Sequence, residues 1–153
     1  MPTALILMTF KPVYALEIVD GLKKCEVRSY LGRLSRGDLI LIYASTPIKS
    51  LIGEFICGNV YVGSYLSIIK VLKERCLPMS EENLGFIKRN YSLSRKKLIL
   101  IEVLNPVKYR NYIPLSKLRE VLGKGFKPPR SYLRILPGSR EYRELMELRE
   151  VVR

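Results

Sequence analysis

The sequence predicts an α+β fold in which a mixed or antiparallel sheet forms a small β-barrel flanked by helices. Three observations support this class. The chain has 153 residues, of which 48% are hydrophobic, enough for one domain with its own core. The expected elements follow the order β-α-β-β-β-α-α-β-α-β-α, so several strands are neighbours in the sequence. The helices do not alternate regularly with strands, as they would in a doubly wound sheet.

The first part of the chain is expected to supply two strands and a helix, followed by a buried strand. Residues 3–10 (TALILMTF) are a short apolar run typical of a strand, and Pro12 and Gly21 mark the start and end of a helix. Residues 24–30 alternate between charged and apolar side chains, which predicts a half-buried strand. Residues 39–44 (LILIYA) are continuously apolar, as in a strand buried on both faces.

The middle of the chain is expected to hold a long strand followed by two helices. Residues 51–62 read as the strand, with Gly53 and Gly58 at bulges or bends. Residues 64–76 carry apolar side chains at helical spacing. Ser80 is an N-cap followed by two glutamates and predicts a second helix to about Tyr91.

The last part is expected to alternate strands and helices. Residues 96–104 (KKLILIEVL) predict a strand, and Ser116 is expected to cap a short helix that ends at Gly123. A final strand is expected over residues 132–136, and Ser139 is expected to cap a C-terminal helix.

The charge of the chain indicates an anionic partner. Its 27 basic and 14 acidic residues give a net charge of +13. Thirteen basic and only two acidic residues lie between Lys88 and Arg134, whereas residues 139–153 are neutral. Such a local excess favours contact with nucleic acid or another polyanion. The alternatives are a solvated basic face or a thermophilic surface, although thermophilic surfaces usually balance the two signs.

Composition excludes several kinds of site. The chain has no histidine, so an imidazole base, a His-containing triad and His-ligated zinc or haem are ruled out. Cys25, Cys57 and Cys76 lack CxxC spacing and are expected to be reduced thiols of a cytoplasmic protein. We expect neither a metal nor a cofactor. No apolar run approaches the roughly 18 residues of a membrane span, and the N-terminus lacks the basic region of a secretory signal.

The most informative stretch is GLKKCEVR, residues 21–28. Here a helix ends and a strand begins, which places Lys23 at the turn and puts Glu26 and Arg28 on one face of the strand. Arg28 can bind a phosphate or a base edge, and Glu26 can orient Arg28 or accept from a base amino group. The alternative is an ion pair between Glu26 and Arg28 on a solvated strand.

Aromatic residues are interleaved with the basic residues of the 88–134 segment. This pattern suits single-stranded RNA, whose bases stack on rings while its phosphates pair with Lys and Arg. The rings are Tyr91, Tyr109, Tyr112, Phe126 and Tyr132, and the densest run is KYRNY at 108–112. Half of them are expected in the core, with one or two at the surface. The triple charge at 95–97 is either a phosphate contact or a guard against aggregation of the next strand.

The pattern G-x-K-x-x-E-x-R after a first helix resembles the ASCH domain family of the PUA-like superfamily. Other segments that resemble the family are FKPVY at 10–14, RGD at 36–38, YAS at 43–45, LIGEF at 51–55 and PPRSY at 128–132. The resemblance covers roughly residues 3–136 and looks closest to short archaeal stand-alone members. It implies a PUA-like β-barrel with flanking helices and a cleft at its rim. We expect a single domain over residues 1–153, with a C-terminal helix at about 139–152 packed on the barrel.

The resemblance also implies a function. The family is similar in fold to RNA-binding PUA domains, and RNA-linked roles have been proposed for it. Carried over by position, Lys23, Glu26 and Arg28 are the central cleft residues. Further candidates for nucleic-acid or ligand binding are Lys11, Ser45, Arg130 and Tyr132. We therefore expect binding of RNA, single-stranded or structured, or of a modified nucleotide, through a basic cleft.

Two other classes of function stay open, so the sequence does not decide whether the protein is an enzyme. Some bacterial members of the superfamily are amidohydrolases of acetylated cytidine, but they place a threonine nucleophile where this chain has Glu26. An amidohydrolase-like enzyme would use Glu26 as a general base on water and Lys23 to hold the developing oxyanion. A nuclease-like enzyme would use Glu26 as the base and Lys23 and Arg28 for charge stabilisation. The other class is a transcription-linked protein-interaction module, for which the neutral C-terminal helix would supply the contact.

Overall fold

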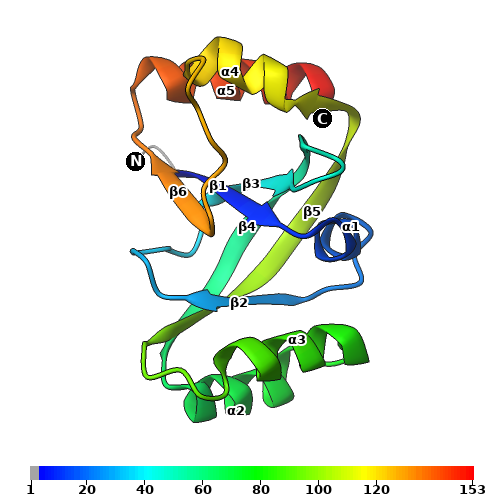
Figure 1. Cartoon of the computed structure of the whole chain (residues 1–153), viewed down its shortest axis with the longest axis vertical. Helices are drawn as coiled ribbons and strands as arrows, with labels where there is room; N and C mark the ends of the chain where they lie inside the picture. Colours follow the sequence, from blue (N-terminus) through cyan, green and yellow to red (C-terminus); the bar gives the residue numbers. More distant parts are fainter. Residues whose placement is uncertain (1–3) are drawn as a thin grey trace.

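The computed structural model describes residues 4–153, in which six strands form one mixed sheet flanked by five helices (Figure 1). The strands are β1 (Leu5–Phe10), β2 (Cys25–Ser29), β3 (Leu39–Ala44), β4 (Ser50–Gly63), β5 (Leu98–Pro114) and β6 (Tyr132–Ile135). The helices are α1 (Pro12–Val19), α2 (Tyr65–Arg75), α3 (Glu81–Tyr91), α4 (Leu115–Leu122) and α5 (Arg140–Val152). The predicted α+β class and order of elements are confirmed. Thr3, the expected first residue of the first strand, lies outside the described residues.

The sheet has the order β2-β5-β4-β3-β1-β6, so β2 and β6 are its edge strands. β1 pairs with β3 in parallel, and the other neighbouring pairs are antiparallel. Register shifts between β4 and β5 fall at residues 51–53, 54–56 and 57–60, which include the two glycines expected at bends. A Cβ at Gly53 would lie 2.3 Å from the carbonyl oxygen of Val107, so glycine permits this close approach of β5. These irregularities bend the long strands and curl the sheet into a half barrel.

Helices close both ends of the half barrel (Figure 1). One apolar cluster lies inside the half barrel beneath α1, and a second lies beneath α4 and α5. A third fills the space between α2, α3 and the strands β2 and β5. All six residues of β3 are buried, as its continuous apolar run predicts. Burial of these three clusters is the main stabilising contribution to the fold.

Serine caps fix the starts of three helices. The hydroxyls of Ser64, Ser80 and Ser139 each accept a hydrogen bond from a backbone N–H three residues further on. The predicted caps at Ser80 and Ser139 are thus confirmed. The predicted cap at Ser116 is wrong, because α4 begins at Leu115 directly after β5. β5 extends ten residues beyond the predicted end at residue 104, since its polar second half continues to pair with β4.

The expectation that all three cysteines are reduced is also wrong. Cys25 and Cys76 form a disulfide that ties the first residue of β2 to the C-cap of α2. The two residues are 51 positions apart in the sequence, and the pairing of β2 with β5, on which α2 packs, brings their Cα atoms to 5.6 Å. Cys57 is a buried free thiol, and burial raises its pKa to about 12.

The C-terminal helix α5 packs on the sheet through a charged contact as well as an apolar one. Leu145 is buried in the cluster beneath α4 and α5. Arg149 pairs with Glu54 of β4, and the Tyr109 hydroxyl of β5 donates to the same carboxylate at 2.9 Å. All three residues are at least nine-tenths buried. No helix between residues 4 and 153 combines the length and apolar character needed to span a membrane.

Candidate functional site

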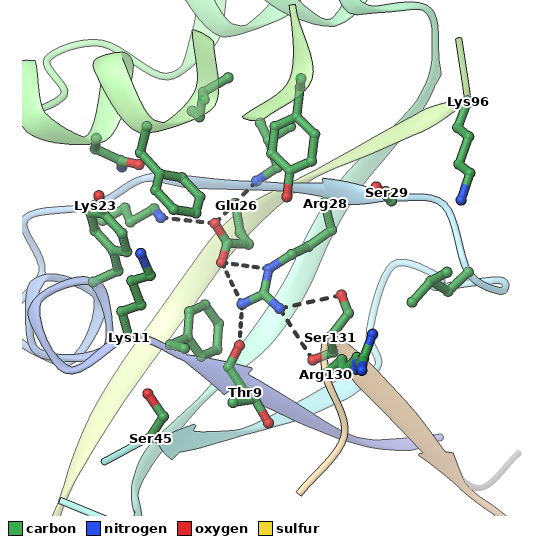
Figure 2. Close-up of a pocket in the computed structure, with 18 residues that line it drawn as sticks. Thr9, Lys11, Lys23, Glu26, Arg28, Ser29, Ser45, Lys96, Arg130 and Ser131 are labelled. Carbon is green, nitrogen blue, oxygen red and sulfur yellow. Dashed lines mark hydrogen bonds and ion pairs between the residues drawn. The ribbon is translucent and has the colours of Figure 1, made fainter. Parts of the chain in front are cut away.

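The open side of the half barrel is bridged by a side chain. Arg28 projects from the edge strand β2 toward β1 and β6 on the other side of the opening (Figure 2). Its Nη2 donates to the backbone oxygen of Thr9 on β1. Its Nη1 donates to the backbone oxygen and hydroxyl of Ser131, just before β6, at 3.2 and 3.3 Å. Arg28 therefore joins strands that are not neighbours in the sheet.

A pocket of about 630 Å³ lies at this opening, a volume typical of small-molecule sites. We call it the seam pocket; β1, β2, the first turn of α1, α3 and residues 130–131 form its walls. Its charged lining side chains are the cations Lys11, Lys23, Arg28, Lys96 and Arg130 and the single anion Glu26. The pocket is therefore strongly positive and suits an anionic ligand.

Glu26 is the centre of the hydrogen-bond network in the pocket. Its Oε1 accepts from Lys23 Nζ at 2.8 Å and from the Val27 backbone N–H at 3.2 Å. Its Oε2 accepts from Arg28 Nε and Nη2 at 3.0 and 2.9 Å. Burial alone would raise the pKa of this carboxyl, but the charges and hydrogen bonds of Lys23 and Arg28 outweigh burial and lower it. Glu26 is therefore an ionised, fully bonded carboxylate at neutral pH.

Lys23 and Arg28 differ in what they leave available to a ligand. Arg28 makes five hydrogen bonds from its three side-chain nitrogens, which accounts for its full donor capacity. Lys23 is only 3% exposed, and within the described residues it donates one hydrogen bond, to Glu26, of the three that an ammonium group can make. Arg28 thus holds the walls of the pocket together, whereas Lys23 retains hydrogen-bond donors that a ligand can use.

Three further cations stand at the exposed rim of the pocket. Lys11, Lys96 and Arg130 are all exposed and line the pocket from different segments (Figure 2). Among the described residues none of them pairs with an acidic side chain. Lys11 Nζ lies 4.8 Å from the centre of the Phe86 ring. These cations are free to contact anionic groups of a ligand.

Aromatic rings form much of the apolar wall and support the cations. Lys23 Nζ lies 4.9 Å from the ring centre of Tyr14, and the Arg28 guanidinium lies 4.6 Å from that of Phe10. Cations placed over ring faces in this way are attracted by the ring quadrupole. Tyr91 of α3 also lines the pocket.

The structure brings together six of the seven residues predicted from the sequence. These are Lys11, Lys23, Glu26, Arg28, Ser45 and Arg130, all of which line the seam pocket. Tyr132 is not among the lining residues. Its hydroxyl donates to the carbonyl of Gly32 and accepts from the Leu31 N–H, both at 2.7 Å, so it ties the loop after β2 to β6.

Sequence reasoning also missed one region of the pocket. The KYRNY run at 108–112, which was not among the predicted cleft residues, lies on β5 and does not line the pocket; its Tyr109 is buried against Glu54, while Tyr112 is exposed. The missed region is α3, which contributes Asn83 and Phe86. The sequence signal that could have identified α3 is Asn83, a polar residue that lies one helical turn before Ile87, on the buried face of the helix. No group of three or more Cys, Asp or Glu within residues 4–153 is placed to hold a metal ion.

The ASCH domain model matches residues 8–129, most of the chain. This chain belongs to the ASCH domain family. The matched range contains the whole seam pocket except Arg130 and Ser131, which follow directly. A comparison of this ASCH chain with curated proteins finds no match.

Solved structures support the same fold. An ASCH protein from Zymomonas mobilis has a TM-score of 0.77 to this chain at 24% identity, and the match covers 94% of each chain. The N-terminal domain of McrB from Staphylothermus marinus has a TM-score of 0.61 at 16% identity, covering 99% of this chain and 98% of that one. A hypothetical protein from Leishmania major gives 0.58 at 12% identity, covering 98% and 96%. The ASCH chain thus has the PUA-like half-barrel fold.

Proposed function

We propose that this ASCH domain binds RNA or a modified nucleotide in the seam pocket. Family and fold support RNA binding as the general class of function. The observation that carries the proposal is a group of three exposed cations, Lys11, Lys96 and Arg130, at the rim of a nucleotide-sized cavity, with no acidic partner in the part of the chain that the structure describes.

The charge of the pocket determines the chemistry of its ligand. Lys23 and Arg28 are neutralised in part by Glu26, but the three rim cations have no such partner in the described chain. Phosphate groups supply the missing negative charge and accept several hydrogen bonds from Lys and Arg. The aromatic and apolar walls in turn suit a nucleobase. A nucleotide or an RNA strand combines both chemistries.

The bonding of Glu26 favours binding over hydrolysis. A general base must have a free lone pair facing water or substrate and a pKa near the working pH. Each carboxylate oxygen of Glu26 already accepts two hydrogen bonds, and the pKa of Glu26 is lowered rather than raised. Glu26 therefore acts in this proposal as a positioning residue that holds Lys23 and Arg28.

Fluorescence anisotropy with labelled short single-stranded RNA across a salt series tests this proposal. We compare Lys11→Ala and Arg130→Ala with Lys124→Ala, which removes the same charge from an exposed position outside the pocket. Each lost phosphate contact should reduce the slope of log K against log salt by about 0.7. We expect this reduction in the two pocket variants and little change in the control. An equal loss in all three variants would show that the binding reflects net charge alone.

A further inference from the structure

We propose that one unstacked nucleobase enters the seam pocket and that Asn83 recognises its edge. This inference rests on the proposed function and specifies it further. The rim cations hold the phosphate, and the interior of the pocket selects the base.

Asn83 is a polar side chain that the fold buries without bonding it. It lies in the first turn of α3, where its backbone N–H donates to the Ser80 hydroxyl at 3.1 Å. The residue is 1% exposed and lines the pocket, yet its Nδ2 has no hydrogen-bond partner among residues 4–153. Buried amides are almost always bonded, because an unpaired one retains the full cost of desolvation. A ligand in the pocket supplies the missing acceptor.

The other buried side-chain atom without a partner within residues 4–153, Thr9 Oγ1, does not face the pocket. Thr9 lies on β1 on the same face as Leu5 and Leu7, opposite to Phe10, and it reaches the pocket network through its backbone oxygen (Figure 2). Among the described residues, Asn83 Nδ2 is therefore the buried, unpaired donor that belongs to the seam pocket.

The chemistry of the Asn83 side chain indicates a base rather than a phosphate. Its carboxamide is neutral, whereas the exposed cations suited to phosphate, Lys11, Lys96 and Arg130, lie at the rim. A carboxamide offers a donor and an acceptor side by side, which matches the hydrogen-bonding edge of a nucleobase. The neighbouring Phe86, Ile87 and Tyr91 of α3 provide apolar contact for a planar ring. A base reaches such a pocket only when it leaves the stack.

The test compares ligands that differ only in the base. Isothermal titration calorimetry with the four nucleoside 5′-monophosphates and with ribose 5-phosphate separates the base from the sugar phosphate. We expect at least one nucleotide to bind about ten-fold more tightly than ribose 5-phosphate, the effect of roughly one or two hydrogen bonds. In Asn83→Leu we expect this preference to fall about ten-fold, while ribose 5-phosphate binds as before.

Control measurements separate recognition from folding. Asn90→Leu removes an exposed carboxamide from the same helix and should leave the preference unchanged. Because Leu removes an unpaired buried amide, Asn83→Leu should melt at the same temperature as the wild type or higher. In the wild type, the Asn83 side-chain amide signals should shift in ¹H–¹⁵N spectra when the nucleotide is added, a readout that needs no variant.

Each outcome decides between the two proposals. The base inference is overturned if Asn83→Leu retains the full preference, if the Asn83 amide signals do not move, or if no nucleotide exceeds ribose 5-phosphate. RNA binding that still depends on Lys11 and Arg130 would then leave the proposed function standing. Loss of that dependence as well would overturn the proposed function itself.

Discussion

Replacement of Glu26 by glutamine tests the charged network that shapes the seam pocket. Glutamine preserves the size and shape of the side chain and removes its negative charge. In this variant Lys23 and Arg28 would contact a neutral amide instead of a carboxylate. The site is buried, since Glu26 is only 6% exposed. Removing one partner from a buried ion pair costs about 3–5 kcal/mol, because the remaining charge is left uncompensated. We expect Glu26→Gln to lower the free energy of unfolding by this amount.

Urea denaturation at neutral pH measures the loss. Glu120→Gln is the matched control, because Glu120 forms an exposed ion pair with Lys117 on α4. Exposed pairs of this kind contribute about 0–1 kcal/mol. A loss below about 1 kcal/mol in Glu26→Gln, no larger than in the control, would refute the claim that this network stabilises the fold.

The pH dependence of the same variant provides an independent check. The pKa of Glu26 is lower in the folded state than in the unfolded chain, so the folded state binds fewer protons on this residue. The contribution of Glu26 to the free energy of unfolding is therefore complete above the ordinary carboxyl pKa of about 4.3. It declines as the pH falls through the lowered pKa that Glu26 has in the folded state. Wild type and Glu26→Gln should converge in acid. A constant difference at low pH would contradict this linkage.

Three further predictions concern the rest of the fold. Replacing both Cys25 and Cys76 with alanine removes a cross-link between residues 51 positions apart and should lower the free energy of unfolding by about 4 kcal/mol. A urea unfolding curve with the same midpoint and the same slope as the wild type would contradict this. Ellman's reagent should find no reactive thiol in the native protein, because Cys57 is buried and burial raises its pKa to about 12. After unfolding without reductant it should find one thiol; three thiols would disprove the disulfide. Arg149→Met leaves the buried Glu54 carboxylate without its cation and should lower the free energy of unfolding by about 3–5 kcal/mol. The double variant with Glu54→Leu should recover most of this loss. Equal losses in the single and the double variant would show that the unpaired charge is not the cause.

Local signals in the sequence predicted much of the fold. The apolar run of β3, proline at the start of α1 and the serine caps of α3 and α5 each act within a few residues, so their effect is readable without tertiary structure. β5 was predicted too short because its second half is held by pairing with β4 rather than by its own pattern. The Cys25–Cys76 disulfide depends on sheet order, which no spacing along the chain reveals.

The candidate site was predictable to a similar extent. Strand alternation places Glu26 and Arg28 on one face, and the structure pairs them with Lys23. The bridge from Arg28 to Thr9 and Ser131 requires the curvature of the half barrel and had no local signal. α3 reaches the pocket by packing on β2, so its contribution also depended on tertiary contacts.

The location of the ligand is tested most directly by ¹H–¹⁵N chemical-shift mapping with short single-stranded RNA. We predict that the largest shifts fall on residues of the seam pocket, among them Lys11, Lys23, Asn83 and Arg130. Shifts confined to α4 and α5, or no larger in the pocket than at the basic residues of segment 88–134 that lie outside it, would contradict the proposal that the seam pocket is the binding site.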